Sequence, residues 1–199
     1  MLNSKMESQE SMTADELIVA IRIRIADPDQ RIAMRTVPPP PLFGVVAASA
    51  LEKTEADLGF RIPVLLRRLY SEVGNGGFGP GAGMLGVEGG YCDSEGRTLA
   101  PCYLEFKSWG WPDGLLPLWD WGGGALSCVD SLSADERIVT HDESGPVVTR
   151  FTLLSWLESW VDGVDLWREI YEMESGVLTN PFTHAPVVVA RRGRAKGLV

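Results

Sequence analysis

Residues 50–63 read ALEKTEADLGFRIP, and this stretch carries the signals that decide the fold. Leu51 and Leu58 lie on one side of a helical wheel with charged residues opposite, which predicts an amphipathic helix starting near Val45. Gly59 suits the end of that helix because glycine adopts positive φ without steric strain. Pro63 suits the first turn of a second helix, which we predict over residues 63–73. The stretch therefore predicts two consecutive helices with a short connection.

The residues that follow predict an antiparallel sheet and a closing helix. Residues 74–77, Gly-Asn-Gly-Gly, favour a turn, and a short strand at 83–87 and a helix at 98–107 come next. Four strands are expected at residues 115–121, 125–130, 137–142 and 147–151, each bounded by Gly, Ser, Asp or Pro. From Thr152, apolar residues recur at steps of three and four as far as Tyr171, so a last helix must bury its stripe against the sheet. The predicted fold class is α+β, with the helices packed on one face of a mainly antiparallel sheet.

Composition divides the chain into three segments. Residues 1–44 hold a predicted helix over 13–26, opened by a capping box of Thr13 and Glu16, and a stiff connector at the proline run 38–41. Residues 45–175 form the predicted α+β domain. Residues 176–199 are predicted to be an irregular, basic C-terminal tail that carries Arg-Arg-Gly-Arg-Ala-Lys at 191–196.

Charge is distributed unevenly along the chain. The net charge is −9, but residues 45–176 carry 9 Lys/Arg and 21 Asp/Glu, a balance of −12, while the remaining segments sum to +3. An acidic domain repels phosphate backbones and attracts cationic molecules. We therefore expect a protein partner and no nucleic acid, with solubility as the other explanation of the acidity.

Several features predict a soluble, cytoplasmic protein without membrane association. Apolar residues make up 45% of the chain, enough for a substantial core. No apolar run approaches the ~20 residues that span a bilayer, and the polar residues 1–10 do not resemble a signal peptide. Cys92, Cys102 and Cys128 leave one thiol unpaired in any disulfide scheme, which fits a reducing compartment.

Catalysis and cofactor binding find little support in the sequence. Residues 81–86, Gly-Ala-Gly-Met-Leu-Gly, match G-x-G-x-x-G, but a dinucleotide site needs a strand before the glycines and a helix after them, and here a Gly/Pro turn precedes a strand. His141 and His184 have no second His or Cys at metal-ligand spacing, and there is no G-x-S-x-G motif. We predict no enzyme, no metal and no cofactor. A small-ligand site at the Gly-rich loop is the least favoured alternative.

Blocks of the chain resemble the Smi/Knr family, part of the SUKH superfamily of bacterial immunity proteins and fungal cell-wall regulators. The blocks are the stretch 50–63, the Leu69-Tyr pair with the Asn75-Gly turn, residues 115–122 (LLPLWDWG) followed by 128–130 (CVD), and residues 151–157 (FTLLSWL). The resemblance spans about residues 45–172 and implies an α+β domain that binds proteins without catalysis. It assigns structural roles to Glu55, Leu58, Gly59, Pro63, Tyr70, Asn75 and Gly76.

Charge and resemblance together predict an immunity-type protein that neutralises a basic, nuclease-type toxin. Trp109, Trp111, Trp119 and Trp121 lie close together in the sequence, either as interface anchors or as core residues. Trp119 and Trp121 share one face of a strand, so both are buried or both exposed, and they would anchor a partner if exposed. The candidate partner-binding residues are Glu88, Trp119, Asp120, Trp121, Asp130, Asp142 and Glu143. A regulatory scaffold with several weak partners, as among fungal members, is the alternative.

Overall fold

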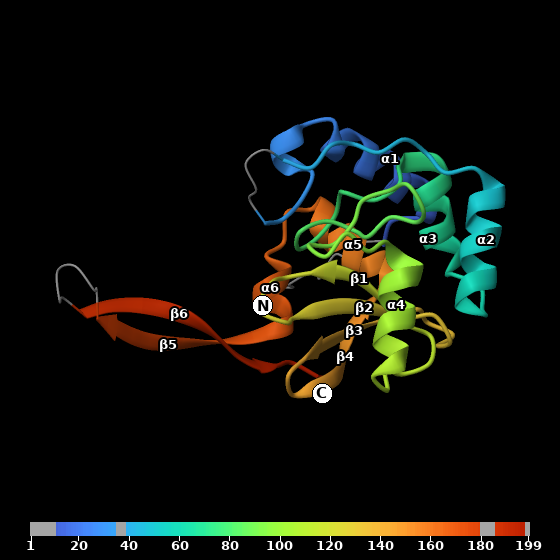
Figure 1. Cartoon of the computed structure of the whole chain (residues 1–199). Helices are drawn as coiled ribbons and strands as arrows, with labels where there is room; N and C mark the ends of the chain where they lie inside the picture. The colour runs from blue at the N-terminus through green and yellow to red at the C-terminus, as the bar shows by residue number, and fades with distance from the viewer. Residues whose placement is uncertain (1–10, 35–38, 180–185, 198–199) are drawn as a thin grey trace, which may run out of the picture.

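The computed structural model describes residues 11–34, 39–179 and 186–197, and their side chains except over 174–191. Residues 1–10, Pro38 and His184 thus lie outside the described residues, together with what the sequence predicts for them. Figure 1 shows a body of helices and sheet from which a two-stranded ribbon projects.

Most helices begin and end at the predicted signals. α1 (Ala14–Ile25) opens with the capping box of Thr13 and Glu16. α2 (Ala48–Leu58) ends at Gly59, whose φ is 82°. Pro63 directly precedes α3 (Val64–Arg68), which continues as a π-helical turn, η2 (Leu69–Val73). α4 spans Leu99–Ser108, and a 3-10 turn, η1 (Pro28–Gln30), follows α1.

The sheet is an antiparallel meander. Its strands are β1 (Leu115–Asp120), β2 (Leu126–Asp130), β3 (Arg137–Asp142) and β4 (Gly145–Thr152), in the order β1-β2-β3-β4. On one face, the buried side chains of α5 (Leu153–Val161) join one core with those of Leu116, Val129 and Ile138. This arrangement confirms the α+β class. A β-bulge interrupts β1 between Pro117 and Trp119.

α1 belongs to the same core as the sheet, although it lies outside the predicted α+β domain. Its inner face is fully buried, with Leu17, Ile18, Ile21 and Ile25 each at most 3% exposed. The helix contacts α5 and η2. Arg24 Nη1 donates to the Val161 carbonyl at 3.0 Å and its guanidinium stacks over a tryptophan ring of α5. The N-terminal helix is therefore a structural part of the body.

Three predicted elements differ from the structure. The single helix predicted from Thr152 to Tyr171 is wrong, because α5 ends at Val161, Gly163 takes a φ of 80°, and a separate turn, α6 (Leu166–Ile170), follows. The strand at 83–87 is reduced to an isolated bridge between Met84 and Trp119. The prediction of an irregular tail from residue 176 is also wrong, because β5 (Tyr171–Thr179) and β6 (Pro186–Ala195) pair as an antiparallel ribbon.

The Gly-rich loop packs tightly between the N-terminal segment and β1. Gly79 N–H donates to Arg31 O at 2.8 Å, and Ala82 N–H donates to Asp120 O at 2.8 Å. Gly81 has a φ of 56°, and a Cβ there would lie 2.5 Å from Asp120 O. Glycine at this position therefore lets the loop approach the end of β1 closely, which fixes one border of the groove described next.

Candidate protein-binding groove

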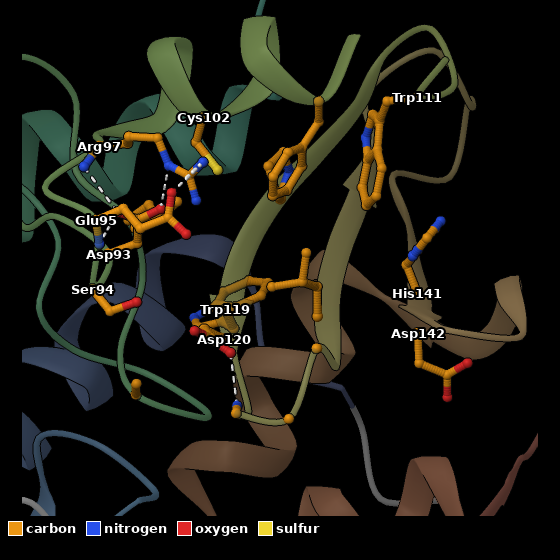
Figure 2. Close-up of a pocket in the computed structure, with 18 of the residues that line it drawn as sticks. Asp93, Ser94, Glu95, Arg97, Cys102, Trp111, Trp119, Asp120, His141 and Asp142 are labelled. Atoms are coloured by element: carbon orange, nitrogen blue, oxygen red, sulfur yellow. Dashed lines mark hydrogen bonds and ion pairs between the residues drawn. The ribbon is translucent and has the colours of Figure 1, made fainter. Parts of the chain in front are cut away.

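The face of the sheet turned away from α5 carries a groove of about 1090 Å³. Its floor comes from alternate residues of the strands, including Pro117, Leu126 and His141, which point away from the buried row of Leu116, Val129 and Ile138. Residues 91–97, α4 and residues 109–112 form its walls. Figure 2 shows Asp93 and Glu95 on one side and His141 and Asp142 on the other, with Asp120 between them.

One wall is a connected row of aromatic rings. Phe106 lies 5.6 Å from Trp109 and 4.9 Å from Trp111, and Trp111 lies 4.2 Å from the His141 ring, measured between centroids. Trp111 is held in place because its Nε1 donates to Leu115 O at 2.6 Å. Trp109 is 69% exposed at the end of the row. The wall therefore offers flat aromatic surface, part fixed and part free.

The groove is strongly acidic. Asp93, Glu95, Asp120, Asp142 and Glu143 line it, against Arg97 as the one Lys or Arg among its lining residues. Arg97 is already neutralised, because its guanidinium pairs at 2.8 to 2.9 Å with Asp93, Glu95 and Glu105. Among the described residues, Asp120, Asp142 and Glu143 take part in no ion pair; the eleven pairs found there involve other groups. The free charge of the groove is therefore negative.

Asp120, Asp142 and Glu143, which form no ion pair within the described part of the chain, differ in exposure. Asp142 is only 8% exposed, and its Oδ1 accepts the Ser144 N–H at 2.8 Å. Burial, and secondarily the Asp142 charge, raises the pKa of the neighbouring Tyr171. Asp120 lines the groove and its Oδ1 accepts the Gly122 N–H at 2.7 Å, while Glu143 is exposed. Local backbone thus orients Asp120 and Asp142 through one oxygen each.

The structure gathers only part of the predicted partner-binding set. Asp120, Asp142 and Glu143 meet at the groove. Glu88 lies elsewhere, 69% exposed and paired with Lys53 at 2.6 Å. Asp130 accepts the backbone N–H groups of the turn after β2.

The expectation for the two strand tryptophans needs correction. Trp119 is 0% exposed, so the condition for its role as an anchor is not met, although it lies beneath the groove. Trp121 is half-buried, and its Nε1 donates to Ser127 Oγ at 2.8 Å. Both rings pack near Trp156 of α5, which agrees with their predicted position on one face. That face is the core side, because the bulge in β1 keeps both rings under α5.

Sequence reasoning passed over the tryptophans that do reach the groove. Trp109 and Trp111 stood in the same cluster but lay outside any predicted strand, so no periodicity assigned them a face. Their flanks, Gly110 and Pro112, are the available signal, since an aromatic between loop-forming residues is often surface-exposed. Asp93 and Glu95 were likewise lost among many carboxylates.

The groove holds no arrangement suited to covalent or phosphate chemistry. Burial raises the pKa of the Cys102 thiol to about 12, which leaves it protonated and a poor nucleophile. Burial lowers the pKa of His141, and no described Ser or Cys hydroxyl or thiol is hydrogen-bonded to it. The N–H groups of Gly79, Ala82 and Gly83 donate within the chain and are not free to hold phosphate. Within the described part of the chain, no three His, Cys, Asp or Glu side chains gather as a metal site.

The residues of the family pattern make contacts within the chain that hold the helices and the neighbouring loops in place. Glu55 accepts the Ile62 N–H and pairs with Arg67 at 2.8 Å, which ties α2 to α3. The buried Tyr70 hydroxyl donates to Leu85 O at 2.6 Å. Leu58 is buried in the core. The Asn75 side-chain amide donates to Val87 O and accepts the Val87 N–H. A Cβ at Gly76 would lie 2.5 Å from a backbone oxygen, so this position accepts only glycine.

These features together define an α+β domain with an acidic groove, and a family comparison places it. Residues 46–163 match the SMI1 / KNR4 family (SUKH-1), so the chain belongs to that family. Immunity proteins are among its members, and the family is generally non-catalytic. No curated protein and no solved structure was found to match the chain. None of the described helices is both long and apolar enough to cross a bilayer.

Proposed function

We propose that the chain is an immunity-type inhibitor that binds a basic toxin domain on its groove face. The observation that carries this proposal is the groove itself, where Asp120 and Glu143, which form no ion pair with a described residue, lie beside an aromatic wall. Family membership supports a binding role, since the family includes immunity proteins. The free thiols of Cys92, Cys102 and Cys128 are consistent with action in the cytoplasm.

Charge complementarity supports a basic partner in particular. A domain with a balance of −12 over residues 45–176 attracts a cationic surface at long range and raises association rates toward ~10⁸–10⁹ M⁻¹s⁻¹ at low salt. Nuclease domains are basic where they hold the phosphate backbone, so an acidic inhibitor competes for the surface that the nucleic acid needs. Exposed tryptophan then supplies short-range contact area at low entropic loss.

Affinity capture and growth rescue test this function. The full chain is immobilised and exposed to lysate of its source cells at low salt, and the bound protein is eluted with rising salt and identified. We expect one partner rich in Lys and Arg whose expression arrests bacterial growth, with growth restored when the chain is co-expressed. An acidic partner, or a basic partner without toxicity that the chain relieves, would reject the immunity role.

A regulatory scaffold is the second outcome that the same experiment detects. It predicts several partners recovered together at low yield, each lost at moderate salt, and no growth arrest by any of them. Gel filtration of the chain with each partner separates the two cases, because an inhibitor forms one complex of fixed stoichiometry.

A further inference from the structure

The two halves of the groove carry the same chemistry, but only one half holds a cation. In the first half, the Arg97 guanidinium lies 5.4 Å over the Phe106 ring and pairs with three carboxylates. In the second half, the Trp111 and Trp109 rings continue the aromatic row and Asp120, Asp142 and Glu143 supply carboxylates, with no ion pair to a described residue.

The internal Arg97 is therefore a guide to what the second half recognises. A guanidinium is planar, stacks on aromatic faces and pairs with carboxylates through fixed N–H groups, which a lysine ammonium does less well. The Trp109 ring, 69% exposed at the end of the row, offers the stacking surface. Trp111 beside it is held by Leu115 O and the His141 ring, so this part of the wall loses little side-chain freedom on binding.

We propose that this second half, bounded by Trp109, Trp111, Asp120 and Glu143, is an arginine-binding subsite for an extended segment of the partner protein. The inference rests on the proposed function and specifies which part of the partner is held. One arginine stacks on the tryptophan wall and pairs with a rim carboxylate, and a neighbouring apolar side chain covers Pro117 and Leu126 on the floor. The volume of about 1090 Å³ lies at the upper end of the ~300–1,000 Å³ range of ligand pockets and accommodates several side chains of a peptide.

A labelled peptide in which arginine alternates with valine is the probe. Its binding to the full chain is measured by fluorescence anisotropy at low salt and at about 1 M salt, where the Debye length is ~3 Å. We expect saturable binding that is about three- to tenfold weaker when lysine replaces arginine and is lost when glutamine replaces it. Equal binding of the arginine and glutamine peptides, or no saturable binding of the arginine peptide, would overturn the subsite.

Chain variants locate the binding. Trp109→Ala removes a largely exposed ring, and the double variant Asp120→Asn, Glu143→Gln removes two charges while keeping an acceptor for the Gly122 N–H. The matched control is the double variant Glu52→Gln, Asp162→Asn, which removes the same charge from exposed positions outside the groove. Each groove variant should bind the arginine peptide about tenfold more weakly while its melting temperature stays unchanged, and the control should bind it at most about twofold more weakly.

Failure of the subsite is distinct from failure of the proposed function. If the control weakens the peptide as much as the groove variants do, the attraction is a property of net charge and the subsite falls. If the toxin captured from lysate binds the groove double variant as tightly as the original chain, the inhibitor role stands and the subsite falls. If the groove selects arginine but no basic toxin is captured, the subsite stands and the inhibitor role falls.

Discussion

Replacing Ile21 by alanine should destabilise the protein strongly, although Ile21 lies outside the segment that matches the family. Ile21 is 0% exposed on the inner face of α1. Truncating such a buried side chain to alanine lowers the free energy of unfolding by about 2–5 kcal/mol, which includes the cost of the cavity that remains. The same helix supplies its own control, since Ile23 is 71% exposed two residues away. Ile23→Ala should change stability by no more than ~0.5 kcal/mol, with a slight gain because alanine is the better helix former.

Urea unfolding followed by tryptophan fluorescence measures both variants. Trp160 of α5 is buried beneath the Arg24 guanidinium of α1 and is one of seven tryptophans, so the summed emission follows unfolding of the body together with this interface. The expected difference between the two variants is about 2–4 kcal/mol in the free energy of unfolding. A difference below ~0.5 kcal/mol would refute the placement of α1 in the core. Complete removal of α1 deletes four such buried side chains, whose burial contributes ~1.5–3 kcal/mol each; the sum is comparable with the whole stability of a domain, so the truncated chain should not fold.

Three further predictions concern single positions. Tyr70→Phe leaves the buried Leu85 carbonyl without the donor that lies 2.6 Å away, and should lower the unfolding free energy by about 1–3 kcal/mol in the same urea assay. Gly81 and Gly123 have nearly the same φ, 56° and 57°, so alanine at either position adds the same backbone strain of ~1 kcal/mol. Only at Gly81 would the new Cβ lie 2.5 Å from a backbone oxygen, so Gly81→Ala should lower the melting temperature more than Gly123→Ala. Equal shifts in melting temperature would contradict the close packing of the loop on β1. Burial lowers the pKa of His141 below 6.5, so folding favours the neutral ring. The contribution of His141 to stability is therefore present above pH 6.5 and is lost as the pH falls through the pKa of the folded state. An NMR titration of His141 with a midpoint above 6.5 would contradict this prediction.

The sequence predicted the parts of the fold that local signals determine. The capping box at Thr13, the left-handed Gly59 and the helix-starting Pro63 each act within one turn, and each is found in its predicted place. Strands β1 to β4 followed their bounding turn residues for the same reason. Short-range chemistry therefore set most of the element boundaries.

The misses come from long-range packing. The apolar spacing from Leu153 to Tyr171 continues through Gly163, but the chain breaks there so that Trp167 can pack on Trp121 while Tyr171 starts a strand. The faces of Trp119 and Trp121 depended on which side of the sheet α5 would cover, and alternation alone does not decide that. Trp109 and Trp111 lie in a loop, where no period applies, and only tertiary structure turned them into a wall.

The two faces of the sheet place different constraints on its residues: one face packs in the core and the other lines the groove. Along β2, Val129 is committed to the interior beneath α5, while Leu126, at the same strand's other end, lies on the groove floor. Replacing exposed residues of the rim therefore leaves the interior intact, whereas the floor is constrained because Leu126 packs on a second buried cluster that contains Cys128 and Val139. The rim can therefore change over generations while the fold persists, and under the proposed inhibitor role such changes would alter which partner the groove binds.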